Sequence, residues 1–325
     1  VQLEPTKFMP TLEQMRAEKS KVVIFPIDEK APLAKKAGAG SVATGEVEKY
    51  LLEAGSVELV DRSAAEKMKD ELALIELSGK GEISSPQIAD YAVMGEISSV
   101  QISSMFWPSG KPGKQMVGAV LQQLTGIEVE NPPEYEYTAS VKGKLKIFQL
   151  ATAKMIKTIE LDDDKSITKL PLALGWIVTN IPPNLPESEE IGLITGAASD
   201  AVESARFDLK NFFSRKGYVL EKRTSPDGKH FIFLVSFGTS DGAKEGEEVV
   251  IYTLEESASK LGGPTTVEEV PIGKAKIADI LKSNECWIHT DDAALAERIK
   301  MGDYVKIHYS KGLGDYAKKA GKILF

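Results

Sequence analysis

The first two thirds of the chain switch between strand-like and helix-like spacing of apolar residues. A continuous apolar run from Val22 to Ile27 is typical of a strand buried on both faces. Residues 29–44, rich in Lys, Ala and Gly, are interpreted as a loop. Alternating apolar and polar residues predict further strands at 56–60, 91–105, 135–149 and 155–161.

Helical spacing occurs in the segments between these strands. A short helix is expected from Gly45 to Gly55, where glycine closes it. Ser63 and Glu66 fit a capping box, in which each side chain accepts a hydrogen bond from a free backbone N–H of the other residue. A helix through Leu72 should follow. Ser85-Pro86 predicts one more helix start.

The longest helical signal runs from Ile191 to Phe212, with apolar residues every three or four positions. Small residues lie among them, so we expect this helix to pack unusually close to a sheet or to a neighbouring molecule. They are Gly192, Gly196, Ala197 and Ala201. The helix should end near Ser214–Gly217, where we place a domain boundary.

The remainder of the sequence is interpreted as strands and turns only. A hairpin turn is predicted at Pro226–Lys229. The strands are expected at 218–223, 230–237, 248–252, 270–280, 284–289 and 304–309. Five or six short strands in about 108 residues indicate a small barrel or sandwich.

Composition agrees with two folded domains that do not bind nucleic acid. Of 325 residues, 42% are hydrophobic and 27% are charged, and a chain of this length usually forms two domains. The net charge of -8 supplies no basic footprint for nucleic acid. No apolar run approaches the ~18 residues of a transmembrane helix. Cys286, the only cysteine, is interpreted as a core strand residue.

The candidate reactive groups form no catalytic cluster. Gly38–Ala43 has the G-x-G-x-x-A spacing of a dinucleotide loop, but it does not directly follow a strand, so we interpret it as a flexible loop. His230, His289 and His308 lack metal-binding spacing. Asp162–Asp164 is interpreted as a solvated turn. We therefore expect no enzyme activity, no cofactor and no metal. A small-ligand enzyme would rest on the glycine string alone.

Two apolar inserts interrupt this pattern, at 106–133 and 166–187. Long apolar loops in a compact domain usually have a function or are disordered. Three interpretations remain open: folding back over the domain's own core, contact with another protein, or insertion into a membrane. The candidate contact residues are Phe106, Trp107, Met116, Val117, Val120, Leu121, Leu172, Leu174, Trp176 and Ile177.

Three strings, at 22–28, 57–63 and 89–97, resemble in order and spacing the successive signatures of the curli-export (CsgG-like) domain. That family is related to the amino-terminal domain of TolB and to the middle domain of the flagellar ring protein FlgT. The resemblance covers roughly residues 20–213. A second resemblance, to the small carboxy-terminal barrel of FlgT-like proteins, rests on the strings at 241–252, 272–277 and 301–305.

The resemblance implies an α+β fold. An extension over 1–20 would precede a CsgG/TolB-N-like α/β domain with a mixed sheet and helices over 21–216. A small all-β SH3-like barrel would follow over 217–325. The implied location is the periplasm or the outer-membrane surface, where such proteins are lipoproteins or periplasmic proteins.

The implied function is that of a non-catalytic structural component of a bacterial envelope machine, of the secretion or flagellar ring type. It would form a homo-oligomeric ring and contact envelope machine proteins, with possible association with the outer membrane. The alternative is an oligomeric outer-membrane secretion pore, because both inserts fall where curli-channel subunits carry their membrane hairpins. The second insert has one apolar run followed by prolines, so its second strand is missing.

Overall fold

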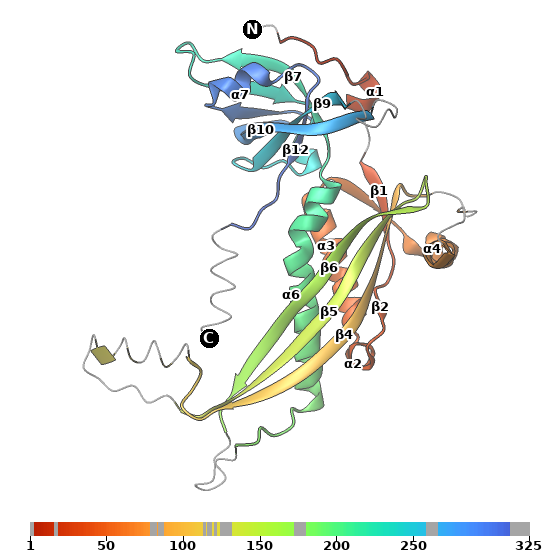
Figure 1. Ribbon diagram of the computed structural model, residues 1–325, viewed down its shortest axis with the longest axis vertical. Helices are drawn as coiled ribbons and strands as arrows, with labels where there is room; N and C mark the ends of the chain where they lie inside the picture. Colours follow the sequence, from red (N-terminus) through yellow and green to blue (C-terminus); the bar gives the residue numbers. More distant parts are fainter. Residues whose placement is uncertain are drawn as a thin grey trace.

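The fold is α+β, with a mixed sheet and its helices followed by a separate six-stranded closed barrel (Figure 1). This confirms the coarse prediction of an α+β fold with a mixed sheet and helices followed by a barrel. The computed structural model describes residues 3–15, 19–78, 83, 88–112, 115, 119, 122–123, 132–171, 180–257 and 266–312. The helix start predicted at Ser85-Pro86 lies outside these residues.

The sheet has the strand order β3-β1-β4-β5-β6, and it combines a parallel part with an antiparallel part. β1 pairs in parallel with β3 and β4, whereas β4, β5 and β6 form a long antiparallel meander. A short strand, β2, pairs with β4 beside the main order. The strands are β1 (Ser20–Ile24), β2 (Asp28–Glu29), β3 (Val57–Val60), β4 (Tyr91–Trp107), β5 (Glu134–Gln149) and β6 (Lys154–Lys169).

Helices cover the two faces of this sheet unequally. α2 (Pro32–Ala37), α3 (Ala39–Ala54) and α6 (Glu187–Phe213) share the largest hydrophobic core with one face. α4 (Glu66–Ser78) packs Met68 and Leu72 on the other face. Beyond α4, that second face carries exposed polar side chains. Among them are Gln101, Ser103 and Lys142.

Two predictions for the amino-terminal part were wrong. Residues 29–44 are mostly helical, because Gly38 adopts φ +67° and lets α2 end and α3 begin at once. The capping box at Ser63 is absent. Asp61 instead caps a short 3₁₀ turn, η1 (Arg62–Ala65), by accepting a hydrogen bond from the Ser63 backbone N–H at 2.8 Å. The helix expected from Gly45 therefore starts earlier, at Ala39, whereas the helix expected after Ser63 starts later, at Glu66.

The run Asp162–Asp164, predicted as a turn, lies inside β6. β6 continues to Lys169, so the second insert is shorter than expected at this end. Asp163 accepts a hydrogen bond from the Ser204 hydroxyl of α6, which gives this acidic side chain a partner on the helix-covered face. The acidic run is thus compatible with a strand because one of its carboxylates is bound.

The carboxy-terminal part forms a barrel with the cyclic order β10-β11-β8-β7-β12-β9. Its strands are β7 (Gly217–Thr224), β8 (Phe231–Val235), β9 (Glu248–Ser257), β10 (Thr266–Leu281), β11 (Cys286–Thr290) and β12 (Tyr304–Ile307). The prediction of strands and turns alone was wrong here, since two short helical segments are present. They are η2 (Thr239–Asp241) and α7 (Ala293–Arg298).

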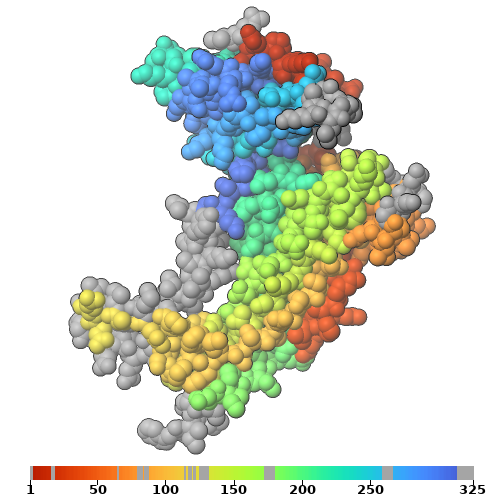
Figure 2. Space-filling model, in the orientation of Figure 1, coloured from red at the N-terminus to blue at the C-terminus, as the bar shows by residue number. Residues whose placement is uncertain are grey.

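The chain's first residues lie against the barrel rather than apart from it. Pro5 forms a parallel β-bridge with Met301, and the Thr6 backbone N–H donates to the Met301 carbonyl at 2.8 Å. Leu3 packs on the barrel core. A short helix, α1 (Leu12–Met15), follows before the chain enters β1. Figure 2 shows the barrel at one end of the sheet domain.

Close backbone contact joins the barrel to the sheet domain. Gly55, at the end of α3, packs against Gly242, which has φ +88°. A Cβ atom added to Gly242 would overlap the backbone oxygen of Ala54. The Asn211 side chain bonds the backbone of Tyr309 at 2.8 Å through both its amide and its oxygen. These contacts fix the barrel to the carboxy-terminal ends of α3 and α6.

Replacing Gly242 tests this junction. We expect Gly242→Ala to lower the free energy of unfolding by about 2 kcal/mol more than Gly228→Ala does. Both glycines have positive φ, but the space around Gly228 is open for 4 Å. Urea unfolding of the two variants measures the difference. Equal losses of stability in the two variants would show that the domains have room for a side chain at Gly242.

Cys286 lies in the barrel core, on β11. Burial, with a smaller contribution from Asp241, raises the pKa of its thiol to about 12. We therefore expect Ellman's reagent to modify native protein roughly a hundredfold more slowly than urea-unfolded protein, because the thiolate is the reactive form. Rapid stoichiometric labelling of the native chain would contradict this placement.

Candidate interaction site at the far end of the sheet

Both predicted inserts leave the sheet at the same end, far from the barrel (Figure 1). The first connects the end of β4 to the start of β5, where Trp107 pairs with Glu134. The second leaves β6 after Lys169, which pairs with Tyr135 of β5, and leads into α6. Antiparallel pairing thus brings together two segments that lie about 60 positions apart in the sequence.

The structure places two of the ten candidate contact residues. Phe106 packs on the domain's own core, with its ring centroid 5.4 Å from that of Tyr135. Trp107 is half-buried, and its Nε1 donates a hydrogen bond to Glu136 Oε2 at 2.9 Å. Phe106 therefore serves the domain's own core. The other eight candidates lie outside the described residues: Met116, Val117, Val120, Leu121, Leu172, Leu174, Trp176 and Ile177.

An ion pair anchors the start of the first insert to the sheet. Lys111 Nζ lies 2.6 Å from Glu136 Oε1, and the two side chains are only 9% and 19% exposed. The turn that brings Lys111 back includes Gly110, with φ +72°. Gln115 Nε2 donates to the Gly110 carbonyl at 2.9 Å. Sequence reasoning missed this pair, because Lys111 lies among flexible-looking Gly and Pro residues.

Glu136 is held in its charged form by this arrangement. Burial alone would raise the pKa of Glu136, but the hydrogen bonds from Lys111 and Trp107 outweigh burial, and the pKa lies below its ordinary value. The carboxylate therefore links the end of β4, the first insert and β5 through two charge-assisted bonds. The base of the first insert is fixed in place.

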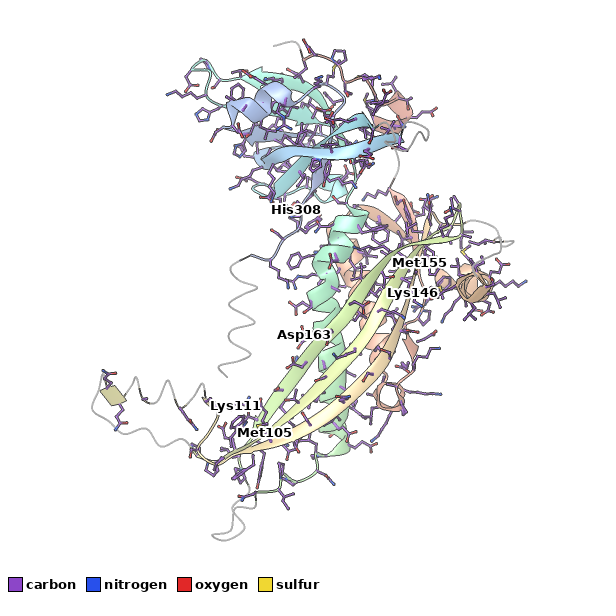
Figure 3. All side chains as sticks on the ribbon, viewed as in Figure 1. Met105, Lys111, Lys146, Met155, Asp163 and His308 are labelled. Carbon is purple, nitrogen blue, oxygen red and sulfur yellow. The ribbon has the colours of Figure 1, made fainter. Side chains whose placement is uncertain are left out.

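Large apolar side chains are exposed beside these inserts. Met105 is 53% exposed on β4 just before the first insert, and Leu170 and Ile181 are 62% and 78% exposed within the second insert. Figure 3 shows Met105 and Lys111 at this end of the long strands, remote from His308 near the barrel. Single exposed apolar residues are ordinary. These three matter because two apolar stretches of sequence adjoin them.

The second insert is also tied back before α6 begins. The Tyr137 hydroxyl, on the helix-covered face of β5, donates to the Pro183 carbonyl at 2.7 Å. Lys169 at the end of β6 pairs with Glu189 in the first turn of α6. Burial raises the pKa of Tyr137, so its hydroxyl stays protonated and able to donate. Both ends of this insert are therefore fixed to the sheet.

The glycine string Gly38–Ala43 does not form a loop for phosphates. Gly38 ends one helix, and Gly40 lies in the first turn of α3. The Gly40 backbone N–H donates to Glu29 Oε1 at 2.7 Å. A carboxylate of the protein itself therefore occupies the helix start where a dinucleotide phosphate would have to bind. The interpretation as a flexible loop was also wrong, since these residues are helical.

The other polar groups among the described residues offer little chemistry. Within the described ranges, no group of three or more His, Cys, Asp or Glu residues is arranged to hold a metal. His230 Nδ1 lies 2.7 Å from Asp291 Oδ1, and both side chains are well exposed on the barrel surface. This contact raises the pKa of His230. In the part of the chain that is placed, no helix is long and apolar enough to span a membrane.

No known protein family and no curated protein matches the sequence. Among solved structures, the hypothetical protein CT253 from Chlamydia trachomatis is similar with a TM-score of 0.27 and 12% identity, over 60% of this chain and 98% of that one. A dodecameric PelC variant from Paraburkholderia phytofirmans has a TM-score of 0.19 and 12% identity, over 60% of this chain and 95% of that one. Lipoprotein GNA1162 from Neisseria meningitidis has a TM-score of 0.24 and 10% identity, over 57% of this chain and 99% of that one. At these values the matches carry no argument about function.

Glu136→Gln tests the anchor. We expect it to lower the free energy of unfolding at neutral pH by about 2–3 kcal/mol, because it leaves the Lys111 charge buried without its partner. The effect should shrink as the pH falls through the lowered pKa of Glu136, where the wild-type carboxylate is itself protonated. Urea titrations at several pH values measure both quantities.

Glu160→Gln, at an exposed carboxylate on β6, is the matched control. It should change stability by less than about 0.5 kcal/mol. If Glu136→Gln behaves like this control, the pair does not anchor the insert.

Proposed function

We propose that this chain is a non-catalytic structural component of a bacterial envelope assembly, and that it acts by self-association through the far end of its sheet. The observation that carries the proposal is that both apolar inserts leave the sheet at that one end. Met105, just before the first insert, and Leu170 and Ile181, within the second, are exposed there. Exposed apolar side chains at this end of the sheet are thereby available for contact with a neighbouring molecule.

The shape of the domain supports this use of the inserts. β4, β5 and β6 are 17, 16 and 16 residues long, so they extend about 50 Å at 3.3 Å per residue. They carry the inserts well away from the barrel. The ion pair of Lys111 with Glu136 and the bond from Tyr137 to Pro183 hold both inserts at their bases. Fixed bases reduce the entropy lost when such a surface binds.

The long helix contributes to association less than its sequence indicates. Ala197, Ala198 and Ala201 are buried in the domain's own core, so these small residues serve close packing on the sheet. Gly192 has open space around it, near the inserts. The proposal therefore assigns the intermolecular contact to the end of the sheet.

The finer proposal follows the resemblance to CsgG-like and FlgT-like proteins. The chain would form a homo-oligomeric ring in the periplasm or at the outer membrane, with a CsgG/TolB-N-like first domain and an SH3-like barrel. It would contact the proteins of an envelope machine. The proposal requires no reactive group and no cofactor.

The test is a triple variant, Met105→Ser with Leu170→Ser and Ile181→Ser, compared with wild type by light scattering at micromolar concentration. We expect wild type to be oligomeric and the variant to associate at least tenfold more weakly. Each apolar side chain that leaves an interface costs about 1.5 kcal/mol or more. Circular dichroism should show that the variant remains folded.

The control is Leu74→Ser with Leu77→Ser on α4, two side chains that are 66% and 85% exposed away from the inserts. It should associate like wild type. A monomeric wild-type protein, or equal weakening by both variants, would contradict the proposal. Steady single-channel currents in liposomes would instead favour a secretion pore.

A further inference from the structure

A cavity of about 300 Å³ lies where the barrel meets the sheet domain. Ser20 at the start of β1 and Tyr91 at the start of β4 line it from the sheet. Tyr218 of β7 and Lys306 of β12 line it from the barrel. The end of α6 and the residues that follow it form the wall between them. A ligand in this cavity would touch both domains.

The charge of this cavity is opposite to that of the chain as a whole. Among the described residues that line it, four are cationic, Lys19, Arg215, Lys216 and Lys306, and none is acidic. The complete chain has a net charge of -8. A concave site that gathers positive charge on an acidic protein attracts anions by focusing its field.

Two of these four charges are already neutralised. Arg215 pairs with the buried carboxylate of Asp241, and Lys216 pairs with Glu269. Among the described residues, no ion pair is found for Lys19 or Lys306. The positive charges of Lys19 and Lys306 therefore remain without an ion-pair partner among the described residues. A phosphate group carries about -1.5 to -2 at pH 7, which matches this surplus.

Lys306 lies where a positive charge is disfavoured. Burial and, to a smaller extent, the charge of Lys216 lower the pKa of Lys306, while the carboxylate of Glu269 acts in the opposite direction. Both ammonium groups also approach the ring of Tyr304, at 5.9 and 4.5 Å from its centroid. The one carboxylate of Glu269 acts on both ammonium groups, so a further anion beside Lys306 would stabilise its charged form.

Ser56 provides an independent sign of a ligand. It lines the cavity, its residue is only 3% exposed, and its hydroxyl oxygen has no hydrogen-bond partner among the described residues. A buried hydroxyl without a partner costs roughly 1–3 kcal/mol, so such groups normally bind something. A phosphate oxygen would accept the hydrogen bond that this hydroxyl can donate.

Aromatic rings complete the cavity. Tyr91 packs edge to face with Phe212 and Phe213, at 6.0 and 5.8 Å between ring centroids, and all three line the site with Tyr218. The cavity therefore offers apolar wall next to the cationic groups. This combination suits a phosphate that carries an apolar or aromatic substituent.

We infer that the cavity between the barrel and the sheet domain binds a phosphate ester, with Lys19, Lys306 and Ser56 contacting the phosphate and the aromatic rings contacting its substituent. The phosphate belongs either to a free small molecule or to a lipid headgroup. Because the lining comes from both domains, binding strengthens their junction. The inference does not depend on the proposed function.

Isothermal titration with phenyl phosphate tests the inference at constant ionic strength, with chloride as the replacing anion. We expect a dissociation constant below about 1 mM for wild type. The double variant Lys19→Gln with Lys306→Gln should bind at least about tenfold more weakly, through loss of two charge-assisted bonds. Lys157→Gln, at an exposed lysine of β6, is the control and should bind like wild type.

Ser56→Ala separates ligand binding from folding. Its loss of a donor should weaken phenyl phosphate binding about threefold or more, while the free energy of unfolding stays equal or rises, because an unsatisfied hydroxyl has been removed. Unchanged affinity together with lost stability would contradict the inference, since the hydroxyl would then be structural.

Vesicle flotation identifies the source of the phosphate. Vesicles of phosphatidylcholine with phosphatidic acid are compared with vesicles of phosphatidylcholine alone. Retention on the phosphatidic acid vesicles that is lost in Lys19→Gln with Lys306→Gln indicates a lipid headgroup. Binding of phenyl phosphate without retention on vesicles indicates a small molecule. If neither ligand distinguishes the double variant from wild type, the inference is overturned.

Discussion

The packing of α6 on the long antiparallel sheet is the interaction on which the other features depend. Ala197, Ala198, Ala201 and Ala205 are buried in the core that α6 shares with the sheet and α3, and their small size permits close packing there. The 27-residue helix spans about 40 Å at 1.5 Å per residue. Its first turn lies beside the inserts, and its last turn reaches the barrel. One rigid helix therefore fixes the distance between the insert end of the sheet and the junction with the barrel.

The same helix determines how the barrel is held. Phe213 ends α6 within the sheet core, and the next residue, Ser214, donates to the Ile307 carbonyl of β12 at 3.0 Å. Arg215 then pairs with Asp241 of the barrel. Gly242 also packs against the end of α3. Together these contacts leave little freedom to residues 214–216, which link α6 to β7. The cationic cavity lies at this fixed junction, so its geometry is preorganised for a ligand.

Periodicity was sufficient to predict the larger elements from the sequence. The long helix, the three meander strands and the barrel strands were all visible, because each buries one face against its neighbours over many residues. Short or capped elements were missed. α7 begins at Asp292, which accepts a hydrogen bond from the Leu295 backbone N–H at 3.0 Å, and an Asp before Ala-Ala-Leu was an available signal.

The candidate site was predictable only in part. The apolar composition of the inserts marked them in the sequence, but their meeting at one end follows from pairings such as Trp107 with Glu134. The bond between Lys111 and Glu136 joins residues 25 positions apart, with no local pattern to reveal it. The cavity was still harder to predict from the sequence, since Lys19, Ser56 and Lys306 approach one another only through the packing of two domains.

Site-specific cross-linking between copies measures the central claim most directly, namely that this chain works through the far end of its sheet. Cys286 is the only cysteine in the sequence and is buried, so an introduced thiol can be labelled selectively. With a short bis-maleimide, Met105→Cys should give covalent dimers or higher species in high yield, whereas Leu77→Cys on α4 should remain monomeric. Equal yields from the two positions, or none from Met105→Cys, would contradict the account.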